Sequence, residues 1–136
     1  MTNSLLDCER IVARGVEPRD LKRLPERITV RKSAFIPRKN GNDNDGLSVT
    51  TANGSALERL RNLSPDKEGV TLHVGSVRAM QAGPYRLDVV ADPLESDIDH
   101  ALIIGMPRRH ADESAEEKAG YERLAELLAQ HARCCL

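Results

Sequence analysis

The sequence predicts an α+β domain, in which a mixed or antiparallel sheet of about four to five strands packs under one long C-terminal amphipathic helix. Several short runs alternate apolar and polar residues, which is the period of a half-buried strand. Residues 112–133 instead repeat apolar positions with the period of a helix. Strands that precede a single terminal helix are typical of the α+β class.

The N-terminal segment, residues 1–27, gives the least definite pattern. Residues 4–14 suit either a short amphipathic helix or a strand that ends in a turn at Gly15 and Pro18. Residues 20–24 predict a helical turn that Pro25 stops. Both interpretations of residues 4–14 stay open at this point.

The sheet-rich core is expected over residues 28–110. Residues 28–31 alternate like a strand, and 33–36 are expected to continue it as far as Pro37. Residues 40–46, rich in Asn, Asp and Gly, predict a polar loop before a returning strand at 47–50. Ser55 and Glu58 have the spacing of a capping box that starts a short helix.

Three further strands and the closing helix complete the prediction. Residues 70–74 and 85–91 alternate, and residues 100–104 are apolar on both faces, as in a central strand. A turn is expected after Gly75 and Ser76. The final helix is capped by Asp112 or Ser114, and Leu124, Leu127, Leu128 and His131 lie along one side of it.

Length and composition indicate one globular domain over residues 1–136, since 40% of the residues are hydrophobic and 30% are charged. The three cysteines, Cys8, Cys134 and Cys135, cannot form a regular disulfide framework, so we expect a reducing, cytoplasmic environment. No apolar run is long enough for a membrane helix. No metal or cofactor is predicted. The roles of Cys134 and Cys135 stay open.

The net charge of -1 conceals an uneven distribution. Residues 1–50 hold ten Lys or Arg and seven Asp or Glu, whereas residues 93–136 hold five and nine. Such a gradient could orient the domain on a protein partner. Nucleic-acid binding is not expected, because the basic N-terminal third offers only Phe35 for stacking on bases. The sequence leaves the oligomeric state open, a homodimer included.

Six polar residues are the candidates for catalysis: Arg14, Ser33, Ser48, His73, Asp92 and His100. A basic residue and a serine on separate strands of a split sheet would be analogous to small NAD-using transferases. The Asp92 to His100 region, with His73, could bind a divalent metal or hold a general base, although simple solvent exposure of its carboxylates is the favoured interpretation. None of these residues lies in a nucleophile elbow, a phosphate-binding loop or a zinc-binding spacing, and the 40–46 loop lacks two EF-hand ligands.

A series of short motifs resembles a loosely defined set of small uncharacterised bacterial proteins. These motifs are Arg14-Gly15-Val16-Glu17-Pro18, Ser33-Ala34-Phe35, Asp45-Gly46-Leu47-Ser48-Val49, Val77-Arg78, Asp92-Pro93 and His100-Ala101, followed by the Leu- and Ala-rich terminal helix. The resemblance transfers no activity and no site residues. It implies that the domain is a whole gene product.

Two classes of function follow from the sequence. The first is a non-enzymatic interaction or accessory component of a multi-gene bacterial system, because no complete site is visible. The alternative is a small enzyme, of hydrolase or NAD-using transferase type, with a polar site near Arg14, Ser48, His73, Asp92 and His100. Convergence of these side chains on one pocket would distinguish the two.

Overall fold

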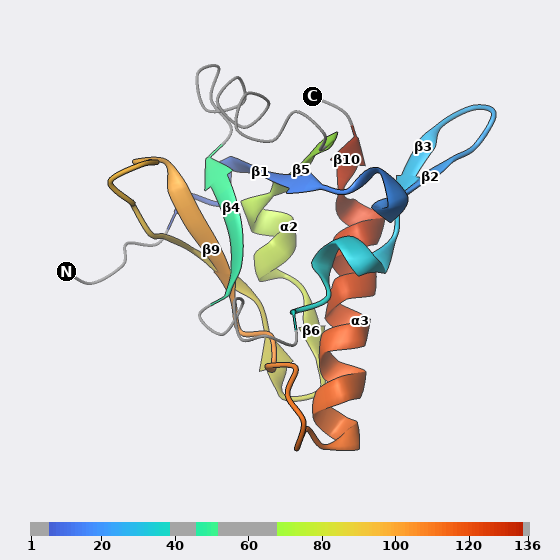
Figure 1. Ribbon diagram of the computed structural model, residues 1–136. Coiled ribbons are helices and arrows are strands. Elements are labelled where there is room, and N and C mark those ends of the chain that lie inside the picture. Colours follow the sequence, from blue (N-terminus) through green and yellow to red (C-terminus); the bar gives the residue numbers. More distant parts are fainter. Residues whose placement is uncertain (1–5, 39–45, 52–67, 135–136) are drawn as a thin grey trace.

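The main element of the fold is an antiparallel sheet, seen in a computed structural model that describes residues 6–38, 46–51 and 68–134 (Figure 1). Its strand order is β10-β5-β1-β4-β9-β8. The strands are β1 (Ile11–Val16), β4 (Leu47–Thr51), β5 (Glu68–His73), β8 (Asp88–Ala91), β9 (His100–Ile104) and the two-residue β10 (Arg133–Cys134). Five strands of four to six residues, with β10 added at the edge, confirm the predicted sheet.

The core lies between one face of this sheet and two helices, α2 (Val74–Arg78) and α3 (Ala115–His131). Strands β1 and β5 pair with Val12 opposite Leu72. Because side chains alternate between the two faces of a sheet, every second residue of each strand points towards the helices. Leu124 and Leu128 of α3 are fully buried against this face. The long helix lies along one side of the molecule in Figure 1, as the sequence predicted.

Helix α3 begins with a capping box. The Ser114 hydroxyl accepts a hydrogen bond from the Glu117 backbone N–H, and the Glu117 carboxylate accepts one from the Ser114 backbone N–H. The second of these bonds, and then the bond from His110, hold the pKa of Glu117 below its ordinary value. Of the two predicted caps, Ser114 is therefore the right one. The helix is shorter than the predicted 112–133, because Arg133 and Cys134 pair with β5.

The structure decides between the two interpretations of the N-terminal segment. Strand β1 begins at Ile11, so the strand interpretation is right for residues 11–14, and no helix forms in residues 6–10. The helical turn predicted at 20–24 is wrong: a 3₁₀ turn, η1 (Pro18–Asp20), precedes strand β2 (Leu21–Arg23). Pro18 favours the start of a helical turn, because its ring fixes φ and it has no N–H to leave unpaired.

Strand β3 (Ile28–Val30) confirms the strand predicted at 28–31, but it pairs with β2 and lies outside the main sheet. The predicted continuation through 33–36 is wrong, because Lys32–Phe35 forms a 3₁₀ helix, η2. Consecutive residues Ala34 and Phe35 are both buried there. A strand would point these two side chains to opposite faces.

The strand predicted at 85–91 is divided into two. Strand β7 (Tyr85–Arg86) forms a small hairpin with β6 (Gln81–Ala82), and β8 begins at Asp88. Between them, the buried Leu87 donates its backbone N–H to the carbonyl of Met80. The strands predicted at 47–50, 70–74 and 100–104 are confirmed, although Val74 opens α2. The capping box at Ser55 and nearly all of the 40–46 loop lie outside the described residues.

None of the helices in the described parts of the chain combines the length and the hydropathy that crossing a membrane requires.

Candidate functional site

An open groove of about 1360 Å³ is the candidate site in the described structure. It lies between β3, the edge of the sheet at β5, and the C-terminal end of α3. In Figure 1 these elements meet beside β10. We call it the basic groove. The lining residues that the argument uses are Ile11, Arg27, Lys32, His73, His131 and Arg133.

Strand β10 covers part of the edge of β5 and borders the groove. Arg133 and Cys134 pair with Thr71 and Val70. The next residues of β5, the buried Leu72 and the exposed His73, also line the groove. Strand β3 contacts β10 but forms no ladder with it.

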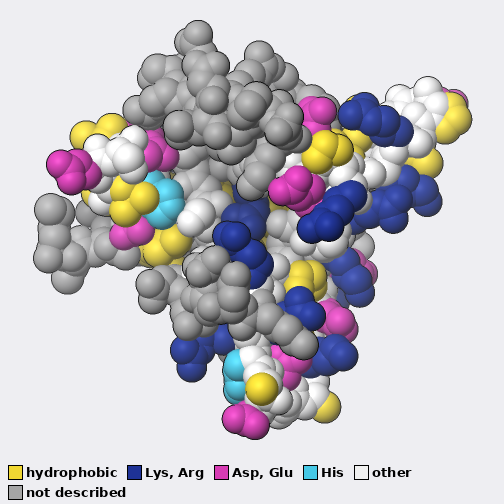
Figure 2. All heavy atoms as spheres, viewed as in Figure 1, with side chains coloured by type: hydrophobic (Ala, Val, Ile, Leu, Met, Phe, Trp, Pro, Cys, Tyr) yellow, Lys and Arg dark blue, Asp and Glu magenta, His cyan; other side chains and the backbone are white. Residues whose placement is uncertain are grey.

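The electrostatic character of the groove is positive. Arg27, Lys32 and Arg133 line it, and Glu126 is the single carboxylate among its described lining residues. Thr71, Ser76 and Gln130 add side chains that can donate hydrogen bonds. Figure 2 shows Lys and Arg side chains gathered around the adjoining β2–β3 hairpin. This combination favours an anionic ligand.

His73 is the one sequence-predicted candidate in this groove, where it lies at the end of β5 with an exposed side chain. His131 lies in the same groove, at the end of α3, and its Nδ1 is 2.9 Å from the Leu127 carbonyl oxygen.

Arg14 occupies the point where β1 and β4 separate. The two strands pair only at Val12 with Thr51 and Ala13 with Thr50. Beyond these pairs, the Arg14 Nε donates to the Ala34 carbonyl at 3.1 Å and its Nη1 donates to the Ser48 carbonyl at 2.7 Å. Arg14 thus joins β1, η2 and β4 through backbone oxygens, which is a positioning role within the fold.

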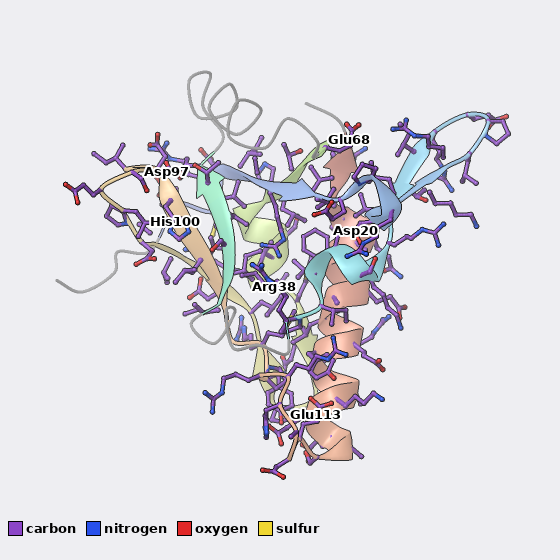
Figure 3. All side chains as sticks on the ribbon, viewed as in Figure 1. Asp20, Arg38, Glu68, Asp97, His100 and Glu113 are labelled. Carbon is purple, nitrogen blue, oxygen red and sulfur yellow. The ribbon has the colours of Figure 1, made fainter. Side chains whose placement is uncertain are left out.

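Ser33 belongs to a separate hydrogen-bond group that holds η1 and η2 together. Its hydroxyl donates to Oδ1 of Asp20 at 2.7 Å, and the Glu17 backbone N–H donates to Oδ2 at 3.1 Å. Asp20 is buried, with 8% of its surface exposed. Figure 3 shows Asp20 at this junction, well away from His100.

Asp92 and His100 form a pair at the opposite side of the sheet. The His100 Nδ1 lies 2.9 Å from the Asp92 backbone oxygen and 3.2 Å from its Oδ2. Thr50 is directly across from His100 on β4, and its hydroxyl is 3.5 Å from Oδ1 of Asp97. In Figure 3, Asp97 and His100 lie on the far side of β4 from Arg38.

The six predicted residues therefore do not meet in one pocket. Arg14 is close to the backbones of η2 and β4, Asp92 pairs with His100, and His73 lies in the basic groove. The Ser48 side chain is exposed and points to the opposite face from Val49, whereas the Arg14 side chain shares the face of Val12. This arrangement gives no support to the enzyme alternative as a single site.

Comparison with known proteins adds no candidate. No family model, no curated protein and no solved structure matches this chain. The resemblance to small bacterial proteins accordingly stays a prediction. Function must be inferred from the geometry described above.

Four groove residues were missed by the sequence interpretation: Arg27, Lys32, His131 and Arg133. The first two belong to the basic N-terminal third, which the charge distribution did indicate. Nothing in the sequence places them beside the end of α3, because β3 reaches that position only through tertiary contacts. Within the described residues, no group of three or more His, Cys, Asp or Glu side chains could hold a metal ion.

Proposed function

We propose that this protein is a non-enzymatic interaction domain, and that the basic groove binds an acidic segment of a partner protein. The observation that carries the proposal is the groove itself, which three cationic side chains and one carboxylate line among the described residues. A surface of one charge attracts and orients a partner of the opposite charge.

An extended segment fits this groove better than a small molecule. The depression is open and long enough to run from Ile11 past β3 to Arg133. Arg27 and Arg133 would bind the carboxylates of such a segment. The side chains of Thr71, Ser76 and Gln130 could donate hydrogen bonds to its backbone carbonyls.

The test is a titration of a fluorescent Glu-rich peptide, with a composition-matched Gln-rich peptide as the control ligand. Binding of the Glu-rich peptide alone, weakening as salt is raised, is the expected result. Equal binding of the two peptides, or no binding of either, would contradict the proposal.

Charge-reversal variants locate the binding surface. The double variant Arg27→Glu with Arg133→Glu is expected to lower the affinity for the Glu-rich peptide by about tenfold or more. The reason is that each reversal replaces an attraction with a repulsion. Arg86→Glu is the matched control, since Arg86 is an exposed arginine on β7 and does not line the groove. Equal loss in the control would place binding elsewhere.

A single-stranded oligonucleotide is the third ligand in the same experiment. The groove has no Phe, Tyr or Trp among its described lining residues, and so lacks the stacking platforms typical of single-strand binding proteins. Binding of the oligonucleotide in preference to the Glu-rich peptide would overturn the proposal in favour of a nucleic-acid partner.

A further inference from the structure

The β8–β9 loop, residues 92–99, is an acidic turn with exposed aliphatic side chains. Its charged residues are Asp92, Glu95, Asp97 and Asp99, and it contains no Lys or Arg. Ile98 is 75% exposed and Leu94 is 45% exposed. Figure 1 shows this loop projecting from the sheet at the start of β9. Aliphatic side chains this exposed at a loop tip commonly mark a contact surface.

Hydrogen bonds within the loop hold this surface in one shape. Leu94 and Asp97 exchange backbone hydrogen bonds of 2.9 and 3.1 Å in the two directions. The Asp97 carboxylate accepts the backbone N–H of Asp99 at 3.1 Å. A loop ordered in this way loses little conformational freedom when it binds, and this favours its use as a docking element.

The loop and the basic groove are complementary in both charge and apolar character. The exposed large hydrophobic side chains of the described structure are Ile11, Leu94 and Ile98. Two of them are in the loop, and the third, Ile11, lines the groove. The groove is basic where the loop is acidic. A partner that offers carboxylates beside aliphatic side chains fits the groove better than carboxylates alone.

The loop of one chain is held away from the part of its own groove that β3, β10 and the end of α3 form. The Thr51 backbone N–H donates to the Asp99 carbonyl at 2.8 Å, so the loop is fixed at β4, and β4 and β1 separate β9 from β5 in the sheet. Adjacent strands lie about 4.8 Å apart, so β9 and β5 are separated by roughly 14 Å. Contact between the loop and this part of the groove therefore requires two chains.

We propose that the partner of the basic groove is a second copy of this chain, which inserts its acidic 92–99 loop. This inference rests on the proposed function, because it assumes that the groove binds acidic segments. If two copies insert their loops into each other's grooves, a closed dimer results; if each copy inserts its loop into the next one, longer assemblies grow with concentration. In both cases the contact pairs Ile98 with the groove that contains Ile11.

The first experiment is sedimentation equilibrium of the full chain up to about 100 µM, a range that detects weak self-association. Self-association that weakens with salt is expected. The loop variant, Ile98→Ser with Glu95→Lys, is expected to weaken it about tenfold or more, since it removes an apolar contact and reverses a charge. The control Asp112→Lys reverses the charge of an exposed acidic residue outside the loop and should leave self-association unchanged.

The decisive experiment mixes two variants that cannot self-associate. The loop variant keeps an intact groove, and Arg27→Glu with Arg133→Glu keeps an intact loop. Each alone should be a monomer, whereas the mixture should contain a one-to-one complex. Far-ultraviolet circular dichroism and the urea midpoint of each variant confirm that it is folded. A mixture of folded variants that stays monomeric would overturn the inference.

The outcomes separate this inference from the proposed function. A chain that stays monomeric but binds the Glu-rich peptide would overturn self-association and keep the proposed function. Self-association that the loop variant leaves unchanged would also overturn it, because another surface would then form the contact. A loop variant that loses self-association but still binds the peptide supports both.

Discussion

The Ser33 hydroxyl donates a 2.7 Å hydrogen bond to Oδ1 of Asp20, and this bond joins the two 3₁₀ turns that place β3 beside the basic groove. The Asp20 backbone carbonyl also accepts the Arg31 N–H at 2.7 Å. The shape of the groove wall thus depends on one buried carboxylate that the sequence did not single out.

Replacement of this carboxylate should destabilise the fold. Asp20→Ala leaves the Ser33 hydroxyl and the Glu17 N–H without their acceptor, so the free energy of unfolding should fall by about 2 kcal/mol. Ser33→Ala should cost about 1 kcal/mol, and the double variant should cost less than the sum. Urea denaturation measures all three. Additive losses would show that the two side chains do not interact.

Tyr121 should make stability depend on pH in the alkaline range. Burial, and then the 2.8 Å hydrogen bond to Glu113, raises the pKa of Tyr121 from 10.0 to about 12. The unfolded chain therefore loses this proton before the folded one, and unfolding becomes easier as pH rises from 10 towards 12. Below pH 10 this contribution is fully present.

The measurement is the urea midpoint at several alkaline pH values for the wild type and Tyr121→Phe. The variant cannot lose the proton, so its midpoint should fall less steeply between pH 10 and 12. Parallel curves for the two proteins would show that Tyr121 titrates normally in the folded state.

Gly105 should tolerate no side chain. It has φ +99°, and a Cβ at this position would overlap the Arg86 carbonyl oxygen. Gly105→Ala should therefore destabilise the protein by about 3 kcal/mol or more, through both backbone strain and a steric clash. Gly83→Ala is the matched control: φ is +58°, but no atom lies within 4 Å of the added Cβ. It should cost only about 1 kcal/mol. If thermal unfolding showed the same loss of stability for Gly105→Ala and Gly83→Ala, the clash at Gly105 would be relieved by a small movement of the backbone.

Arg78 should protect the free edge of the sheet. Its Nε donates to Oδ1 of Asp88 at 2.7 Å and its Nη2 to the Val89 carbonyl at 3.1 Å. Arg78→Met should lower the free energy of unfolding by about 1–2 kcal/mol and leave the edge strand β8 open to pairing between molecules. Light scattering near the unfolding midpoint would detect such aggregation. Arg86→Met, on an exposed side chain, is the control.

Local patterns predicted the elements whose signal lies within a few residues. Apolar residues with a helical period gave α3, and the Ser114 to Glu117 spacing gave its cap. Alternation gave β4, β5 and β9. The pattern failed at Ser33 to Phe35, where a run suited to a strand forms a 3₁₀ turn, because Ala34 and Phe35 both enter the core.

By itself, the sequence determined the α+β class, the helix with its cap, and the basic character of the N-terminal third, because each follows from residue type and local spacing. Only the tertiary structure decided that β3 and the end of α3 border one groove, that Arg14 is bound by two carbonyls, and that His73 is separated from His100. The order of strands in a sheet depends on contacts between distant residues, and these are made only when the whole core packs.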